Sequence, residues 1–394
     1  MSNTKNKDVL ERIENAILNV KNKENTLYFF VADARNIPNA KMEYVYDLAY
    51  TLNSLGYKTC MLYQLENEYT ENELNELIRK QKPIDEQRRF IGVGEWLGER
   101  YAKLEHLNIS KGTWQVSPSD FLFIPEAFAG LMKETYHKHI PCKRYVIVQN
   151  FRHITEFIPF GDQWASYGIT DAITTSKKQS DFVNSVFKYV NTYVIPPYVP
   201  EYFRKPLKAK KLIVNVVTKT KDDAEHIVKL FYWKYRPFNF VPFRFLVNFP
   251  REKYAEMLQD GAITIWVDGD SSFGNNAIES MRCGNIVIGK IPENIPEWML
   301  DENGELIPNG FWTDNINDIP DILASVINQW IEDDIPEKVY DEIDNTNKKY
   351  TYEEWKGNVV HMINDIFENR IKEFESVKRI TENKIKESSD TTDE

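Results

Sequence analysis

One stretch of the chain holds most of the side chains that could do chemistry. It runs from Trp266 to Lys290 and reads WVDGDSSFGNNAIESMRCGNIVIGK. Two carboxylates, Asp268 and Asp270, follow an apolar run directly, and a small polar loop then leads to Glu279. Three interpretations fit this pattern: a divalent metal site, a cradle for phosphate and ribose, or a structural loop between two core elements.

The spacing argues against a metal site. Laid on a calcium-binding loop, the stretch offers oxygen ligands at the first, third, fifth and last positions, namely Asp268, Asp270, Ser272 and Glu279. The sixth position must be a glycine for the loop to turn, and Phe273 stands there instead. Transferases that bind a metal through an Asp-x-Asp pair carry it near the front of the chain, whereas this pair lies late. We therefore expect no metal.

A phosphate cradle fits the same residues better. The pattern predicts a helix from about Asn275 to Cys283, whose first turn has free N–H groups and the positive end of the helix dipole. A diphosphate binds there without dedicated lysines, and Gly274 lets the backbone approach a ligand closely. Glu279 lies on the same face as Asn275 and Asn276, where it could accept hydrogen bonds from ribose hydroxyls. A glutamate near a helix N-terminus also stabilises the helix by itself, so a structural role stays open.

Alternating apolar runs and amphipathic segments must position these residues. Strand-like runs occur at TLYFFVA, KTCMLYQ, FLFIPE, RYVIVQN, DAITTS and TYVIPP, and later at LIVNVVT, FRFLVNF, AITIWV and NIVIG. Segments with helical spacing separate several of them, which is typical of βαβ units and parallel sheets. The stretch PPYVPEYFRKPLKAKK interrupts the pattern with prolines and basic residues, so it predicts a linker.

The fold class that follows is α/β. We expect two Rossmann-like domains whose strand ends face each other across a cleft, and a long C-terminal helix. The expected parts are an N-terminal helix, a first domain, a linker, a second domain, the C-terminal helix and a disordered tail, at 1–24, 25–200, 201–211, 212–345, 346–386 and 387–394.

Composition disfavours several classes of protein. With 394 residues, 42% apolar and 28% charged, the chain is typical of a soluble two-domain protein. It has neither the ~20-residue apolar run of a membrane span nor the apolar segment of a signal peptide. The net charge of −11 disfavours non-specific binding to the phosphates of nucleic acids, which requires many lysines and arginines. Three widely spaced cysteines form no zinc pattern and no disulfide framework, so a reducing cytoplasm is expected.

The stretch 271–288 resembles the nucleotide-sugar motif of retaining GT-B glycosyltransferases, the large family 4 group. Their motif has two glutamates with seven residues between them and ends in Gly-x-Pro-Val-Ile. The positions that match here are Phe273, Gly274, Glu279, Met281, Gly284, Val287 and Ile288. The first glutamate is replaced by Ser271, which follows Asp270, and the Leu-Pro pair of the motif by Asn275 and Asn276.

The resemblance implies a donor site. It implies that Glu279 binds the ribose of a nucleotide sugar of the UDP or GDP type. The other implied donor contacts are Ser271, Ser272, Phe273, Gly274, Asn275 and Asn276. Lys219 or Lys221 stands where the family has basic residues on the diphosphate. The nucleotide sugar is the substrate, and the resemblance implies no metal or other cofactor.

For the first domain, the resemblance points to the acceptor. Arg35 and Asn36 follow the first strand, where acceptor or phosphate contacts occur in the family. Asn150 and His153 follow the strand YVIVQ near the expected donor sugar, and Glu126 ends the preceding strand. These three are the catalytic candidates, although a helix cap for Glu126 and a structural loop role for His153 stay open. The resemblance also implies that the C-terminal helix packs back over the first domain.

The expected function is transfer of a sugar from a nucleotide sugar to a hydroxyl of a glycan or another acceptor. The resemblance implies retention at the anomeric carbon. Two alternatives stay open. One is a phage-type DNA base glycosyltransferase, with which the Lys-, Asn- and Ile-rich composition is compatible. The other is a non-catalytic relative that keeps the fold and binds a sugar or a partner protein, because the first glutamate and the family's glycine loops are missing.

Overall fold

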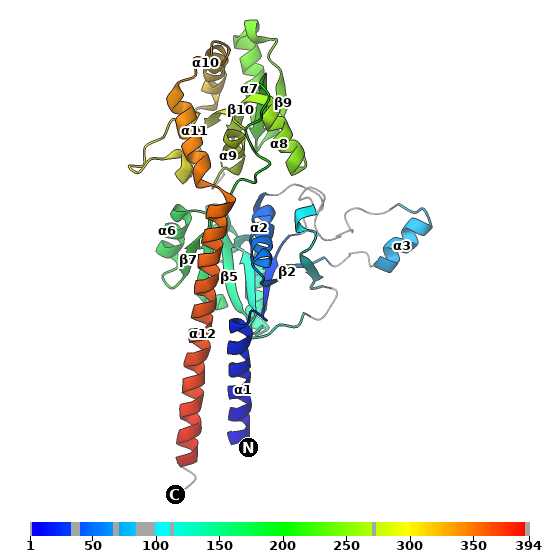
Figure 1. The fold of residues 1–394 in the computed structure, drawn as a ribbon, viewed down its shortest axis with the longest axis vertical. Coiled ribbons are helices and arrows are strands. Elements are labelled where there is room, and N and C mark those ends of the chain that lie inside the picture. The colour runs from blue at the N-terminus through cyan, green and yellow to red at the C-terminus, as the bar shows by residue number, and fades with distance from the viewer. Residues whose placement is uncertain are drawn as a thin grey trace.

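The computed structural model describes residues 2–32, 40–65, 71–83, 99–110, 114–269 and 273–390. Within these ranges the chain forms two parallel β-sheets, which define a first half and a second half of the molecule (Figure 1). Four predicted site residues lie outside the described residues, namely Arg35, Asn36, Ser271 and Ser272.

The first half is built on a seven-stranded sheet with the order β3-β2-β1-β4-β5-β6-β7. Its strands are β1 (Thr26–Phe30), β2 (Lys58–Tyr63), β3 (Glu105–Asn108), β4 (Phe121–Pro125), β5 (Lys143–Val148), β6 (Asp171–Thr174) and β7 (Asn191–Val194). The central strands β1 and β4 are buried along their whole length. A parallel sheet is covered on both faces, so its central strands need continuous apolar runs such as TLYFF and FLFIP.

The second half is built on a five-stranded sheet with the order β12-β11-β10-β8-β9. Its strands are β8 (Lys211–Thr218), β9 (Phe243–Phe245), β10 (Gly261–Val267), β11 (Ile286–Lys290) and β12 (Phe311–Thr313). The middle strand β10 is buried throughout and pairs in parallel with β8 and β11. Residues 195–210 connect the two sheets.

The described part of the chain also forms helices. They are α1 (Ser2–Lys21), α2 (Ala40–Ser54), α3 (Glu71–Arg79), α4 (Ala129–His137), α5 (Phe151–Phe157), α6 (Lys177–Val186), α7 (Lys221–Lys234), α8 (Arg251–Asp260), α9 (Asn275–Arg282), α10 (Ile319–Ile331), α11 (Glu337–Lys349) and α12 (Tyr352–Asp390). Helices α7 to α11 belong to the second half, and α12 leaves it to run along the first half (Figure 1).

The long helix α12 returns to the first half and packs on its core. Trp355, Val359 and Ile363 lie on its buried face, in one hydrophobic cluster with strands and helices of the first half. The Nε1 atom of Trp355 donates a hydrogen bond of 2.9 Å to Thr51 Oγ1 on α2. Helix α1 lies beside the far part of α12 (Figure 1). The long C-terminal helix and its return over the first half were both expected.

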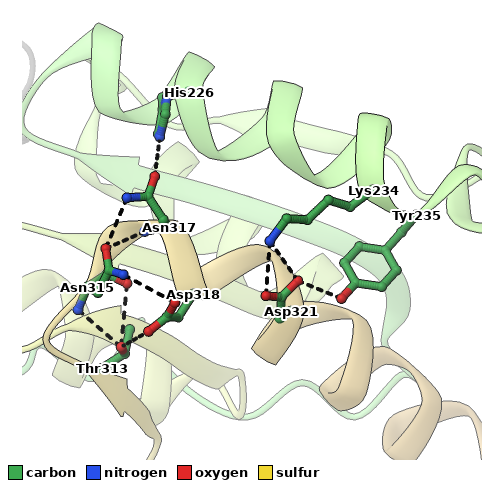
Figure 2. Close-up of polar contacts among 8 residues, drawn as sticks. All are labelled: His226, Lys234, Tyr235, Thr313, Asn315, Asn317, Asp318 and Asp321. Carbon is green, nitrogen blue, oxygen red and sulfur yellow. Dashed lines mark hydrogen bonds and ion pairs between the residues drawn. The ribbon is translucent and has the colours of Figure 1, made fainter.

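Polar contacts tie α7 to α10 on one face of the second half (Figure 2). Near the end of α7, Lys234 Nζ lies 3.0 Å from the Asp321 carboxylate, and Tyr235 Oη donates to the same carboxylate at 2.6 Å. Nearer the start of α7, His226 Nε2 lies 2.7 Å from Asn317 Oδ1 in the segment that leads into α10. These contacts hold α7, which begins just beyond the carboxyl end of β8, in a fixed position.

All the predicted strands are present, and the structure adds two strands that the sequence did not reveal. Both lie at sheet edges: β3 has the partly exposed sequence EHLN, and β12 has only three residues. An edge strand buries less surface, so it needs no long apolar run. The last helix begins at Tyr352 and continues to Asp390, past its expected end at 386. No helix in the described part of the chain is long and apolar enough to cross a membrane.

Candidate functional site

A cavity of about 470 Å³ lies between the two halves. Its wall on the first half includes Lys41, at the start of α2, and Asn150, shortly after β5. Its wall on the second half includes Lys219, directly after β8, and Asp268, directly after β10. The carboxyl ends of strands from both sheets therefore meet here, where open α/β sheets bind ligands. The volume suits a small-molecule ligand.

The first turn of α9 forms part of the cavity wall. Gly274 is its N-cap residue with a φ of +79°, a left-handed conformation that favours glycine. A Cβ atom at this position would lie 2.9 Å from the ring of Trp266, so there is no room for a side chain. Glycine offers no side-chain cap to the first turn. The N–H of Ala277 bonds to the Gly274 carbonyl oxygen at 3.0 Å, and Asn275 and Asn276 are the first two residues of the helix, whose N–H groups have no partner within a helix. Because Asn275 and Asn276 line the cavity, the positive end of α9 faces it.

The loop before α9 is supported from behind by aromatic side chains. The carbonyl oxygen of Phe273 accepts a hydrogen bond from Trp298 Nε1, and the Phe273 ring meets Tyr350 edge to face at 5.2 Å. The rings of Trp266 and Trp298 lie 6.0 Å apart and both contact the position of Gly274. The structure thus brings together at the cavity four of the predicted donor residues, Phe273, Gly274, Asn275 and Asn276.

Of the two lysines proposed for the diphosphate, the structure places one at the cavity. Lys219 lines it, with Nζ 4.0 Å from Asp268 Oδ1. Lys221 begins α7 and does not line the cavity; its Nζ lies 3.0 Å from Glu225 Oε1 on the same helix, and its side chain is 84% exposed. The ammonium of Lys221 therefore lies beside a carboxylate one helical turn away and not at the cavity.

The three catalytic candidates come together on the first half. Glu126 follows β4, is 2% exposed, and accepts a hydrogen bond of 3.0 Å from the backbone N–H of Asn150. The Nδ1 atom of His153 on α5 lies 3.4 Å from Glu126 Oε1. Only Asn150 lines the cavity, and its side chain also caps α5 by accepting from Arg152 N–H at 2.9 Å. Glu126 and His153 therefore stand behind the cavity wall.

Lys41 lies against His153, one of these three residues, and the sequence analysis did not identify it as a site residue. Its Nζ lies 3.2 Å from each ring nitrogen of His153, and it lines the cavity. Burial lowers the pKa of Lys41, Glu126 opposes that effect, and Lys219 adds to it. Lys41 and Lys219 are thus close enough across the cavity to influence each other. The signal in the sequence was the position of Lys41, in the first turn of the helix that follows the first strand.

Glu279 is placed differently from the expectation. It is 2% exposed, and each of its carboxylate oxygens accepts a hydrogen bond from Arg251, at 3.3 Å for the Nη1–Oε2 contact. Arg251 also contacts Glu43 on α2, in the first half. Glu279 does not line the cavity. We expected the carboxylate of Glu279 to be open to a ribose. In this structure it is instead paired with the buried guanidinium of Arg251.

Metal ligands do not cluster in the part of the chain that the structure describes. Within residues 2–32, 40–65, 71–83, 99–110, 114–269 and 273–390, no three His, Cys, Asp or Glu side chains are grouped to hold a metal ion. The three cysteines are buried and unpaired by disulfides. Independence of a metal stays a prediction.

No family model matches the chain, and no curated protein matches its sequence. Solved structures do match it. Sucrose-phosphate synthase from Thermosynechococcus elongatus superposes with a TM-score of 0.58 at 11% identity, covering 88% of this chain and 100% of that one. This chain has the fold of GT-B glycosyltransferases.

Two further structures with the GT-B fold carry ligands. The pneumococcal O-GlcNAc transferase GtfA, in complex with UDP and GlcNAc, has a TM-score of 0.58 at 8% identity and covers 88% of this chain and 99% of that one. A mutant of TarM from S. aureus, in complex with Fondaparinux, alpha-GlcNAc-glycerol and UDP, has a TM-score of 0.54 at 12% identity, covering 86% and 100%. At these identities the likeness establishes the fold.

Proposed function

We propose that the protein is a glycosyltransferase that holds the diphosphate of a nucleotide sugar in the cavity between the halves. One observation carries the proposal: the uncapped first turn of α9 and two lysines from opposite halves, Lys219 and Lys41, converge on one cavity. Helix amides and ammonium groups are the donors that bind a diphosphate in proteins. The GT-B neighbours solved with UDP support a uridine nucleotide as the first ligand to test.

The chemistry follows from where charge develops during transfer. When the bond from the sugar to the phosphate breaks, the departing diphosphate gains negative charge. The N–H groups of Asn275 and Asn276 and the ammonium of Lys219 would stabilise that charge, because all three residues line the cavity before reaction. Retention at the anomeric carbon, with the leaving phosphate accepting the proton of the acceptor, belongs to the proposal, as does a reaction without a metal.

The first half would hold the acceptor. Asn150 faces the cavity, while Glu126 and His153 orient Lys41 from behind. In this arrangement His153 and Glu126 act through Lys41, and both Lys41 and Asn150 line this wall, where they can touch substrate. A hydroxyl of a glycan is the acceptor that we propose, since two GT-B neighbours were solved with sugar ligands.

A second candidate function is a non-catalytic protein that binds a sugar nucleotide or another ligand in the same cavity. The observation that favours it is Glu279, because the carboxylate expected on the donor ribose is held by Arg251. The two candidates differ in one measurable property. A transferase releases free nucleoside diphosphate from a nucleotide sugar, slowly in water and faster with an acceptor, whereas a binding protein releases none.

The test uses two lysines that lie two residues apart. We expect Lys219→Met to weaken UDP or GDP binding by about 10- to 100-fold, the loss of a hydrogen bond to a charged group. Lys221→Met is the matched control, since Lys221 points to Glu225 on the surface of α7. Isothermal titration calorimetry measures both. If both variants weaken binding equally, or if neither does, the proposal that the diphosphate binds in this cavity is wrong.

A further inference from the structure

A buried ion triad crosses between the two halves beside the cavity. Arg251, the first residue of α8, lies between Glu43 on α2 and Glu279 on α9. Its Nε lies 3.0 and 2.9 Å from the two oxygens of Glu43, while Nη1 and Nη2 each donate to one oxygen of Glu279. The three side chains are 13%, 9% and 3% exposed, in the order Arg251, Glu43 and Glu279. Water is therefore nearly excluded from the triad.

The charges in the triad depend on one another. Burial raises the pKa of Glu43 to about 7, against the lowering effect of Arg251. Burial would lower the pKa of Arg251, but Glu279 and Glu43 more than offset this and hold the pKa above its ordinary value. Both carboxylates thus rely on one guanidinium. Without it, the two buried carboxyl groups would lose their ion pairing, and either a buried unpaired charge or the uptake of a proton would disfavour the contact between the halves.

Each carboxylate belongs to a helix whose first turn is a wall of the cavity. Glu43 lies two residues after Lys41 on α2, and Glu279 lies three residues after Asn276 on α9. Lys41 and Asn276 both line the cavity. Arg251 bonds to both carboxylates and thereby links the two helices that carry these first turns.

We propose that Arg251 is a positioning residue that sets the width of the cavity. Its planar guanidinium holds α2 and α9 at the separation at which Lys41 and the backbone amides of α9 contact the same diphosphate. The inference that a diphosphate binds there rests on the proposed function. Buried ion pairs seldom stabilise a protein more than apolar packing of equal volume. The triad instead fixes the relative orientation of the two helices. Nε and the two Nη atoms of Arg251 can bond to two carboxylates in only one relative orientation.

The aromatic neighbours of Arg251 restrict its fork further. Its guanidinium carbon lies 4.9 Å from the centre of the Phe203 ring, in the connection between the sheets, and 5.8 Å from that of Tyr254 on α8. Phe203 is fully buried. A guanidinium with rings beside it has little freedom to turn, so the triad is built to hold one geometry.

Another contact between the halves is of a different kind. The backbone N–H of Lys178 on α6 donates to Glu297 Oε1 at 2.6 Å, and its Nζ donates to the carbonyl oxygen of Ile295 at 2.8 Å. This contact is exposed to water, where such interactions contribute little. Lys178→Ala removes the Nζ contact and keeps the backbone one. We expect it to leave both the separation of the halves and UDP binding unchanged, which makes it the first control.

The experiment measures UDP affinity together with the separation of the halves. Spin labels are attached through Tyr189→Cys in the first half and Trp233→Cys in the second, both exposed positions, while the three native cysteines are buried. We expect Arg251→Met to weaken UDP binding at least ten-fold and to broaden the distance distribution between the labels. Arg251→Lys keeps the charge but loses the fork, so we expect it to restore folding without restoring affinity.

Two further variants separate positioning from folding. Arg244→Met is the matched arginine control, because Arg244 pairs at 3.0 Å with Asp260 within the second half. The triple variant Glu43→Gln, Arg251→Met and Glu279→Gln leaves no unpaired charge, so we expect it to regain thermal stability while UDP binding stays weak. If that variant folds and binds UDP as the wild type does, with an unchanged distance distribution, the inference is overturned.

The same experiment distinguishes failure of the inference from failure of the proposed function. If the wild type binds neither UDP nor GDP, the proposed function fails, and the distance between the labels still reports whether Arg251 holds the halves. An unchanged distance in Arg251→Met or Arg251→Lys would then overturn the positioning role without reference to any nucleotide. If Arg251→Met does not fold, the lysine and triple variants decide the outcome.

Discussion

At the scale of single residues, the direction in which each charge points decides the chemistry of the cavity. Lys41 and Lys219 approach it from opposite halves, whereas Lys221 turns to Glu225 on the surface. From the sequence, both lysines that follow β8 were candidates for the diphosphate, and their spacing could not show which of the two faces the cavity. Spacing predicts where a strand ends, but the turn that follows decides which side chain faces a ligand.

Glu279 shows why some site residues cannot be assigned from the sequence. Its helical position predicted a carboxylate on the face of α9 that opens to a ligand. The structure pairs it with Arg251, which is 28 residues earlier, and Arg251 with Glu43, which is 208 residues earlier again. Ion pairs between distant segments depend on how the two halves pack against each other. A local sequence pattern carries no information about that packing.

One prediction at this scale concerns Lys210, whose Nζ donates to the carbonyl oxygen of Gly261 at 2.7 Å beside the end of α8. Burial lowers the pKa of Lys210 from 10.5 to about 8, with Lys205 adding to that effect and Cys283 and Asp260 opposing it. Between these two values the unfolded chain binds more protons than the folded one. The contribution of Lys210 to stability therefore rises with pH from about 8 to 10.5 and is lost as pH falls through 8.

The check is urea denaturation of the wild type and Lys210→Met from pH 7 to 10.5. We expect the wild type to gain unfolding free energy relative to the variant over this window, by at most about 1.4 kcal/mol per pH unit. Tyrosines and other lysines titrate in both proteins, so their effect cancels in the difference. A difference that stays constant with pH would show that Lys210 keeps an ordinary pKa.

At the scale of elements, the periodicity of the sequence was a good guide to what is buried and a poor guide to edges. The strands at the centre of each sheet were predicted because they are apolar throughout, as in β10. The edge strands β3 and β12 were missed because they are short or partly polar. The start of α9 was predicted from Gly274 and the asparagines that follow, and local turn chemistry fixes it.

The prediction at this scale is that Gly274→Ala damages both α9 and the cavity. A left-handed alanine costs about 1–3 kcal/mol in itself, and its Cβ would also lie 2.9 Å from the Trp266 ring. We therefore expect a fall in unfolding free energy of at least that size, and weaker UDP binding because the first turn of α9 shifts. Thermal denaturation and calorimetry measure the two effects.

Gly304→Ala is the matched control for that substitution. Gly304 has a similar φ of +83°, but a Cβ there would meet nothing within 4 Å. We expect it to lose stability through backbone strain while binding UDP as the wild type does. If Gly274→Ala behaves in the same way as Gly304→Ala, then the first turn of α9 has no part in holding a nucleotide.

At the scale of the whole molecule, two parallel sheets place their carboxyl ends at one cavity, and the GT-B fold follows from that arrangement. The sequence predicted the two α/β units, the connection between them and the helix that returns to the first half. It could not predict how the halves meet, because that depends on single side chains such as Arg251, which contacts Glu43 across the junction. The cavity, and with it the proposed function, depends on that junction.

The most direct measurement of the central proposal is a crystal structure of the protein with UDP bound. We expect electron density for the diphosphate between the halves, with its oxygens about 3 Å from the N–H groups of Asn275 and Asn276 and from Nζ of Lys219. Lys41 would approach the same diphosphate from the first half. Nucleotide density at any other place on the protein, with this cavity holding only solvent at saturating UDP, would contradict the proposal.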